Sequence, residues 1–347
     1  MLTDEKYMQR CIELARLGIG YAAPNPMVGS VVVHEGKIIG EGYHERCGKA
    51  HAEVNAIGSV KDKSLLKSST IYVNLEPCAH FGKTPPCADL IVASAIPKVV
   101  IGTIDPYAEV AGKGIKKLKA AGIEVTVNVL QKECLDLNRR FFTFHEKKRP
   151  YVILKWAQSA DGFIDKLRTP GEKDIYWITA PETRTLVHKW RHEEAGIMVG
   201  RYTVKTDNPS LNCRDYDGVS PTRFVIDQKM RLDYAAFNVG DRNVQTYILT
   251  EKEITSSGQL QFVQPKSFAP KDIMTKLYDL AIQSVIIEGG AYTLNSFLKS
   301  DIFDEIRILT GRTNLDKGTI APTLPKNAVS KDQFKYGKDL INIYRHD

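Results

Sequence analysis

Strand-like and helix-like segments alternate along almost the whole chain of 347 residues, and a single polar segment interrupts the alternation. The first series begins with an amphipathic helical pattern over residues 8–17 and ends near Phe144. The charged segment 145–150 closes with a proline, and a new apolar strand starts at Tyr151. Such alternation is typical of α/β domains, and the length exceeds that of one average domain. We therefore predict two α/β domains, residues 1–146 and 147–347.

The first half of the chain predicts a mixed sheet covered by helices on both faces. Two apolar strands joined by Glu35-Gly36 indicate a hairpin, whereas the later strands are separated by helical segments. The expected strands are 28–34, 37–43, 70–75, 99–104 and 123–129, and the expected helices are 51–57, 87–95 and 114–121.

The second half repeats the alternation and predicts a second α/β domain of about 200 residues. The expected strands are 151–156, 195–199, 222–226, 284–288 and 305–310, and the expected helices are 182–193, 272–280 and 291–299.

Three residues with metal-ligand chemistry, His51, Cys78 and Cys87, give the strongest functional signal. One imidazole and two thiolates form a three-ligand zinc set that leaves a fourth position open for water, as in catalytic zinc sites. We expect His51 and Cys78 each to stand at the start of a helix, where the helix dipole favours a thiolate or a hydroxide. Glu53, two residues after His51, is placed to carry a proton between that water and a leaving amine. The pattern predicts hydrolytic deamination.

The spacing of these residues follows the zinc deaminase signature with one difference. Eight residues, not two, separate Cys78 from Cys87. A structural zinc site would need a fourth protein ligand. The remaining cysteines show no ligand spacing, and we interpret them as small apolar residues: Cys11, Cys47, Cys134 and Cys213.

Nucleotide binding is indicated twice in the second half, each time where a strand ends in glycine. The strand 284–288 is followed by Gly289-Gly290, and the strand 195–199 is followed by Gly200, Arg201 and Thr203. Glycines at a strand–helix junction let backbone amides approach a pyrophosphate. Arg201 and Thr203 are suited to a further phosphate, including the 2′-phosphate that distinguishes NADP from NAD.

Charge and hydropathy exclude several classes of protein. Lys plus Arg (48) exceed Asp plus Glu (41) by seven, a mild and scattered excess that suits phosphorylated ligands better than nucleic acid. No window holds 18 consecutive apolar residues, and the first residues are polar and acidic, unlike a signal peptide. We expect a cytoplasmic protein that binds neither a membrane nor nucleic acid.

The motifs together resemble the family of bifunctional riboflavin-biosynthesis deaminase/reductases over nearly the whole chain. In the first half the resemblance rests on Pro24–Gly29, Gly42–His44, His51–Glu53 and the insert 79–86. In the second half it rests on the segments 155–162, 177–179, 188–191, 203–214 and 288–290. The resemblance implies an N-terminal cytidine-deaminase-like α/β/α sandwich with a mixed sheet and a C-terminal dihydrofolate-reductase-like α/β domain.

The resemblance also implies two reactions and two cofactors. A Zn²⁺-dependent step would deaminate 2,5-diamino-6-(5-phosphoribosylamino)pyrimidin-4(3H)-one to 5-amino-6-(5-phosphoribosylamino)uracil. An NADPH-dependent step would then transfer a hydride to C1′ of the ribose and give the ribityl form. The family resemblance further implies a homo-oligomer.

Site roles follow from the same resemblance. In the deaminase, Zn²⁺ would be held by His51, Cys78 and Cys87, with Glu53 as the catalytic proton carrier, and the substrate contacts would be Asn25, His44, His80, Lys83 and Asp105. In the reductase, the substrate contacts would be Lys155, Arg191, Leu211, Arg214 and Glu288. The NADPH contacts would be Ala157, Trp177, Gly200, Arg201, Thr203, Asp207, Gly289 and Gly290.

Four positions depart from the family pattern: Tyr107, Phe163, Ile175 and Asn208. Tyr107 and Ile175 stand where relatives place an asparagine and a phosphate-binding serine. Two other hypotheses compete with the family interpretation. One is a zinc deaminase of another nucleotide or of RNA with a non-catalytic C-terminal domain, and the other is a nucleic-acid-binding module with structural zinc.

Overall fold

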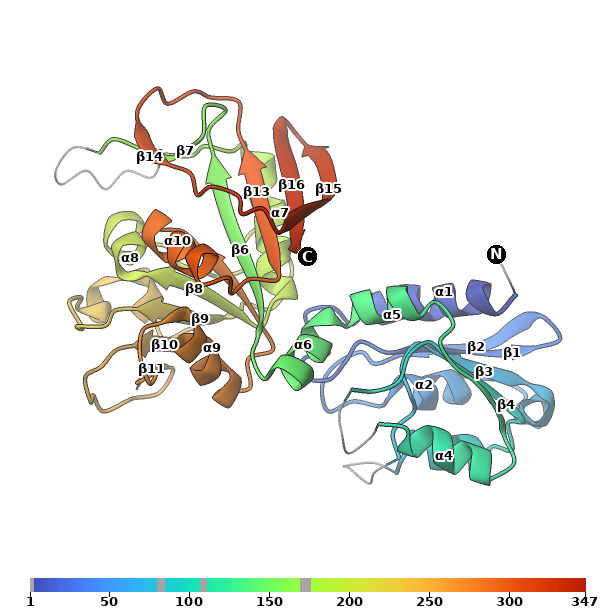
Figure 1. The fold of residues 1–347 in the computed structure, drawn as a ribbon. Helices are drawn as coiled ribbons and strands as arrows, with labels where there is room; N and C mark the ends of the chain where they lie inside the picture. The colour runs from blue at the N-terminus through green and yellow to red at the C-terminus, as the bar shows by residue number, and fades with distance from the viewer. Residues whose placement is uncertain (1–2, 80–84, 107–110, 169–175) are drawn as a thin grey trace. The chain divides into compact units, whose positions relative to one another are not determined.

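The computed structural model describes residues 3–79, 85–106, 111–168 and 176–347 (Figure 1). The chain divides into two compact units, Met1–Lys147 and Lys148–Asp347. The sequence placed the division one residue earlier, after Glu146. None of the helices among the described residues has both the length and the apolar composition needed to cross a membrane.

The first unit is built on a five-stranded sheet in the order β2-β1-β3-β4-β5. The β1–β2 and β1–β3 pairs are antiparallel, whereas β3–β4 and β4–β5 are parallel, so the predicted mixed sheet is confirmed. The strands are β1 (Gly29–His34), β2 (Lys37–Tyr43), β3 (Thr70–Val73), β4 (Lys98–Ile101) and β5 (Glu124–Thr126).

Helices cover both faces of this sheet, as Figure 1 shows. Because side chains alternate along a strand, Val31 packs with α1 and α5 on one face while Val32 packs with α2, α3 and α4 on the other. The helices are α1 (Thr3–Arg16), α2 (Ala52–Ser59), α3 (Cys87–Ala93), α4 (Lys113–Ala120), α5 (Gln131–Leu137) and α6 (Arg139–Lys147), with a short 3-10 helix at Lys63–Ser68.

The sequence missed α5 and α6 and assigned part of α6 to the polar boundary segment. Helix α6 carries a buried pair, Phe141 and Phe142, whose packing on Leu75 holds the helix although its last turn is charged. Tertiary packing of one face therefore extends the helix beyond the end that its polar composition suggests.

The second unit is built on a nine-stranded sheet in the order β11-β10-β9-β8-β12-β6-β13-β16-β15. Pairing is parallel from β11 to β13 and antiparallel at β16 and β15. The strands are β6 (Tyr151–Gln158), β8 (Gly196–Gly200), β9 (Thr222–Ile226), β10 (Thr246–Leu249), β11 (Leu260–Val263), β12 (Ser284–Glu288), β13 (Glu305–Thr310), β15 (Ala328–Tyr336) and β16 (Asp339–His346). A separate pair joins β7 (Phe163–Lys166) to β14 (Gly318–Ile320).

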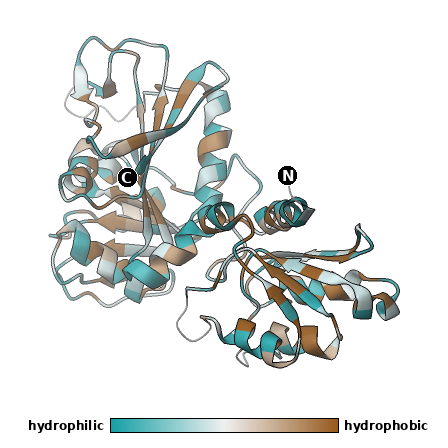
Figure 2. Cartoon of the chain, turned by 45° about the vertical axis from the view of Figure 1, so that its right-hand side comes forward, coloured by the Kyte–Doolittle hydropathy of each residue, from teal (hydrophilic) through white to brown (hydrophobic). Residues whose placement is uncertain are grey.

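Helices also cover both faces of the larger sheet, and Figure 2 shows hydrophobic stretches along several of its strands. On one face, α9 (Pro270–Asp279) and α10 (Ala291–Lys299) pack on Leu154 of β6. On the other face, α7 (Pro181–Glu193) and α8 (Arg201–Asp207) pack on Ile153. Two 3-10 helices, Tyr234–Ala236 and Asn238–Gly240, follow β9.

Candidate active sites

The three candidate ligands of the first unit lie together although they come from three segments. His51 is the N-terminal cap of α2, and Cys87 is the first residue of α3. The Nδ1 atom of His51 lies 3.6 Å from Cys78 Sγ and 3.3 Å from Cys87 Sγ. The expectation that Cys78 starts a helix is wrong, because Cys78 lies in the loop after β3. Its sulfur nevertheless accepts the Cys87 amide at 3.3 Å, so it does meet a helix N-terminus, that of α3.

These separations fit a tetrahedral metal ion. The ligand atoms of His51, Cys78 and Cys87 all lie within 4.8 Å of one another. Zinc–sulfur and zinc–nitrogen bond lengths give tetrahedral edges of about 3.6 to 3.8 Å. The donor set therefore matches Zn²⁺ in both chemistry and spacing, and three protein ligands leave one position open.

The electrostatics of the cluster favour a thiolate beside a protonatable carboxyl. The Cys87 thiol, together with His51 and the Cys87 amide, lowers the pKa of Cys78. Glu53 is only 3% exposed, and burial, reinforced by the negative charge of Cys78, raises its pKa to about 7. A carboxyl with such a pKa can both accept and donate a proton near neutral pH.

A cavity of about 310 Å³ opens onto this cluster. Asn25 and His44 line this cavity and contact each other. Asn25 Nδ2 lies 3.0 Å from His44 Nε2, and His44 Nδ1 lies 3.0 Å from the Ala50 carbonyl oxygen. The Ala50 carbonyl can only accept, so Nδ1 carries the proton and Nε2 accepts from Asn25. Burial lowers the pKa of His44, which favours this neutral form.

Glu76 is a residue of this cavity that sequence reasoning missed. Its buried carboxylate accepts four backbone amides, those of Asp105, Gly112, Gly114 and Ile115, at 2.9 to 3.4 Å. It thereby joins the end of β3 to the start of α4 and fixes Asp105 at the cavity wall. The sequence feature that could have identified Glu76 is its position two residues before the candidate zinc ligand Cys78. His80, Lys83 and Tyr107 lie outside the described residues.

The second unit has a larger cavity, of about 440 Å³, at the carboxyl ends of its parallel strands. Lys155 of β6 and Glu288 of β12 are paired in register. Lys155 Nζ lies 3.7 Å from Glu288 Oε2, and Arg191 of α7 binds the same carboxylate through two hydrogen bonds. Burial alone would raise the pKa of Glu288, but the charges of Arg191 and Lys155 outweigh it and lower that pKa to about 2. Burial lowers the pKa of Lys155.

Leu211 and Arg214 also line this cavity, on the segment that follows α8. Leu211 is buried, whereas the side chain of Arg214 is 46% exposed. Arg214 Nη1 donates to Asn212 Oδ1 at 3.2 Å. Arg214 thus presents a positive charge at the cavity rim.

Most of the candidate cofactor contacts gather at the same cavity, which is lined by Ala157, Trp177, Thr203, Asp207, Gly289 and Gly290. Gly289 and Gly290 have φ values of +87° and +71°, and Gly290 caps α10. These glycines hold the strand–helix junction in a conformation that side chains disfavour, which brings bare backbone to the cavity. The geometry fits a dinucleotide phosphate at this junction.

Gly200 and Arg201 are placed differently. Gly200 caps α8 and does not line the cavity as described. The Arg201 guanidinium lies 4.3 Å from the ring centroid of Tyr202, and its Nε lies 3.7 Å from Asp227. Sequence reasoning also missed Arg168 and Arg184 as cavity residues. Arg168 Nη2 donates to Asp207 Oδ1 at 2.8 Å, and the Arg184 guanidinium carbon lies 3.9 Å from the ring centroid of Trp177. The spacing of these residues in the sequence does not predict either contact.

Comparison with known proteins matches a family model to each of the two units. Residues 1–103 match the cytidine and deoxycytidylate deaminase zinc-binding region, and residues 150–313 match the RibD C-terminal domain. The riboflavin biosynthesis protein RibD of Aquifex aeolicus is 42% identical over 321 residues, covering 91% of this chain and 88% of the relative. The RibD of Bacillus amyloliquefaciens is 40% identical, covering 98% and 91%.

Solved structures agree over the full length. A diaminohydroxyphosphoribosylaminopyrimidine deaminase/5-amino-6-(5-phosphoribosylamino)uracil reductase from Thermotoga maritima superposes with a TM-score of 0.91 at 36% identity, covering 99% of both chains. RibD from Acinetobacter baumannii gives a TM-score of 0.88 at 30% identity, also covering 99% of both chains.

The fold and the two sites define a two-domain enzyme that combines a zinc-type deaminase with a reductase. The C-terminal match argues against a non-catalytic second domain, so that alternative is not favoured. The chain belongs to the RibD family of bifunctional riboflavin-biosynthesis enzymes. The cofactors consistent with this family are Zn²⁺ for the deaminase and NADPH for the reductase.

Proposed function

We propose that the first unit deaminates 2,5-diamino-6-(5-phosphoribosylamino)pyrimidin-4(3H)-one and that the second reduces the ribose of the resulting uracil to the ribityl chain. The observation that carries the first half is the convergence of His51, Cys78 and Cys87 beside the buried Glu53. The second half is supported by the charged cluster of Lys155, Arg191 and Glu288 in a cavity that the glycine-capped start of α10 also lines.

In the deaminase, His51, Cys78 and Cys87 would hold the metal. Zinc in such a site supplies the Lewis acidity that makes water nucleophilic at neutral pH. Glu53 takes a proton from the water that adds to the ring carbon and returns it to the amine, which leaves as ammonia. Asn25, held by neutral His44, offers amide groups to the pyrimidine edge. Asp105 lines the same cavity and would be a further substrate contact.

In the reductase, NADPH supplies the hydride that reaches C1′ of the ribose. Gly289, Gly290 and Thr203 would contact its phosphates, and Ala157, Trp177 and Asp207 would complete its contacts. The protein has to place the sugar against the nicotinamide and keep water out. Lys155 and Glu288, buried and paired, face the sugar, while Arg214 meets the substrate phosphate at the rim.

The experiment follows both products in order. Zinc-loaded protein is given the diaminopyrimidinone substrate, ammonia release is measured, and NADPH is then added while its absorbance is followed. We expect NADPH oxidation only after deamination. Ammonia release without NADPH oxidation on the deaminated product would contradict the second activity, and the reverse result would contradict the first.

Several assignments remain predictions of the sequence. These are the contacts of His80 and Lys83, the cofactor contacts of Gly200 and Arg201, the homo-oligomeric state and the cytoplasmic location. Sedimentation of the purified protein, with and without NADPH, tests the oligomeric state.

A further inference from the structure

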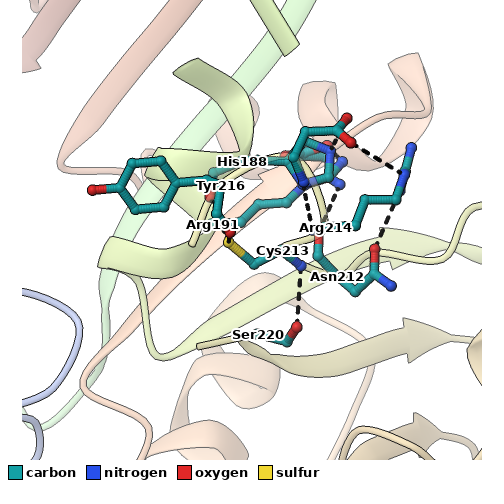
Figure 3. Close-up of polar contacts among 9 residues, drawn as sticks. His188, Arg191, Asn212, Cys213, Arg214, Tyr216 and Ser220 are labelled. Atoms are coloured by element: carbon teal, nitrogen blue, oxygen red, sulfur yellow. Dashed lines mark hydrogen bonds and ion pairs between the residues drawn. The ribbon is translucent and has the colours of Figure 1, made fainter. Parts of the chain in front are cut away.

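The segment 211–215 lies along α7 at the edge of the second cavity, and His188 of that helix is the centre of its contacts (Figure 3). His188 Nδ1 accepts the backbone amide of Arg214 at 3.0 Å and that of Asp215 at 3.4 Å. The other ring nitrogen, Nε2, lies 3.3 Å from Asp215 Oδ2. One imidazole therefore holds two consecutive residues by backbone and by side chain.

These contacts determine the protonation state of His188. Backbone amides can only donate, so Nδ1 must be unprotonated and Nε2 carries the proton toward Asp215. The residue is 3% exposed. Burial and the charge of Arg191 lower the pKa of His188 to about 4, so the neutral ring is the stable form near pH 7.

Further contacts tie the same segment to α7, at His188 itself and one helical turn beyond it. Arg191 Nη1 donates to the Asn212 carbonyl oxygen at 3.2 Å, and the Cys213 thiol donates to the His188 carbonyl oxygen at 3.2 Å. The side chain of Arg214 is then guided from two sides, since Nη1 reaches Asn212 Oδ1 and Nε lies 4.0 Å from Asp215 Oδ1. The backbone of Arg214 is thus fixed while its guanidinium remains half exposed.

We propose that His188 is a positioning residue of the reductase: its neutral ring fixes the backbone at Arg214 and the carboxylate of Asp215, and thereby directs the Arg214 guanidinium at the phosphate of the substrate. This inference rests on the proposed function of the second unit. His188 itself needs no contact with the substrate or with NADPH. Its effect on the reaction passes through Arg214.

Two substitutions at His188 distinguish its role as a hydrogen-bond acceptor from its contribution to packing. His188→Leu fills the site but removes both ring nitrogens, whereas His188→Asn places an amide oxygen near the position of Nδ1. We expect His188→Leu to raise the KM for the deaminated phosphoribosyl substrate about tenfold, the effect of leaving buried amides without an acceptor. The kcat and the KM for NADPH should not change. His188→Asn should stay within about twofold of the wild type, because one amide-accepting oxygen is retained.

His192 provides a matched control on the same helix. It is also buried, and its Nδ1 accepts the Val219 amide at 2.9 Å, yet it does not line the cavity. His192→Leu should therefore lower thermal stability as His188→Leu does while leaving the KM for the substrate unchanged. An equal rise of KM in both leucine variants would overturn the inference, because general loosening of α7 would then explain it.

Binding of ribose 5-phosphate to the full-length protein, measured by calorimetry, gives a readout independent of turnover. Arg214→Ala and the double variant with His188→Leu should bind this probe equally weakly, since the two residues act through one guanidinium. An additive loss in the double variant, or wild-type affinity in His188→Leu, would overturn the inference. If His188→Leu does not fold, His188→Gln, whose amide lies near Nε2 instead, replaces it in the comparison with His188→Asn. Failure of the proposed function is distinguishable, because wild-type protein would then show no NADPH oxidation.

Discussion

Arg191 and Glu288 form a two-bonded ion pair in the cavity of the second unit, with Nε to Oε1 at 3.1 Å and Nη2 to Oε2 at 2.8 Å. The third nitrogen of Arg191 donates to the Asn212 carbonyl oxygen. A guanidinium whose nitrogens are all engaged orders the site more than it binds a further anion. The half-exposed Arg214 is the better candidate for the substrate phosphate.

Arg214→Ala should mainly weaken substrate binding in the reductase. Loss of a charge-assisted hydrogen bond costs about 1.5 to 3 kcal/mol, so the KM for the deaminated substrate should rise roughly 10- to 150-fold with a smaller change in kcat. Steady-state NADPH oxidation measures both constants. Arg231→Ala, at an exposed arginine that does not line the cavity, is the control, and an unchanged KM in Arg214→Ala would remove Arg214 from the site.

Glu53→Gln should abolish deamination and leave reduction intact. Glutamine keeps the shape of the side chain but cannot carry the proton, a loss of about 100- to 10,000-fold for a general acid–base group. Zinc content should be retained because the three ligands are unchanged. NADPH oxidation with pre-deaminated substrate should match the wild type, as should both activities of Glu133→Gln, an exposed control. A joint loss of both activities with zinc still bound would contradict the two-site assignment.

Removal of zinc should separate the two activities in the same direction as Glu53→Gln. Without the ion, hydrogen bonds between the sulfurs and the ring nitrogen take the place of the metal bonds of His51, Cys78 and Cys87. Chelation should therefore stop ammonia release and lower the melting temperature of the first unit, while NADPH oxidation continues. Zinc analysis before and after chelation, with zinc restored as the control, checks this. Deaminase activity at full rate in metal-free protein is the contradicting result.

Gly289→Ala should weaken NADPH binding. The φ of +87° at this glycine costs an L-residue about 1 to 2 kcal/mol, and the chain can relieve that strain only by moving the junction that faces the cavity. The KM for NADPH should rise about 5- to 30-fold. Gly258→Ala is the matched control, since its φ is +57° and a Cβ there meets no atom within 4 Å. Equal effects of the two variants on NADPH would contradict the assignment.

Stability of the second unit should fall with acidification through the titration of His188. Its pKa is about 4 in the folded chain against an ordinary value of 6.5, so the unfolded chain binds the proton more readily. Stability is therefore complete above pH 6.5 and falls as the pH drops toward 4, by about 3 kcal/mol in total. Urea unfolding of the wild type and of His188→Asn between pH 7 and 5 should show a steeper loss in the wild type. If the unfolding free energies of the two proteins changed in parallel with pH, the loss of stability could not be assigned to His188.

The first site shows how far sequence reasoning reached. The sequence predicted the chemistry of His51, Glu53, Cys78 and Cys87 because few residue types bind zinc. A glutamate two residues from a zinc ligand is also placed to carry a proton. Glu76 was missed although it lies two residues before Cys78, since that position does not show that four amides from a distant loop and helix would meet its carboxylate. Cys78 was wrongly placed at a helix start; a helix amide does meet its sulfur, but that helix begins nine residues later in the sequence.

The C-terminal hairpin was not predicted for a related reason. Strand β15 is mostly exposed and polar, so it has no apolar alternation. It exists because β16 pairs with β13 and leaves an edge for β15 to join. The buried strands β9, β12 and β13 were predicted to the residue, since continuous apolar segments carry their own signal.

The sequence by itself determined the two α/β domains, their buried strands and the residues with zinc chemistry, because hydrophobic periodicity and ligand chemistry are local properties. Only the tertiary structure decided which charges pair. It placed Arg191 on Glu288, turned Arg201 toward Asp227, and set His188 beneath Arg214. These relationships depend on the order of strands in the sheet and on burial, which join residues up to a hundred positions apart and which no local pattern encodes.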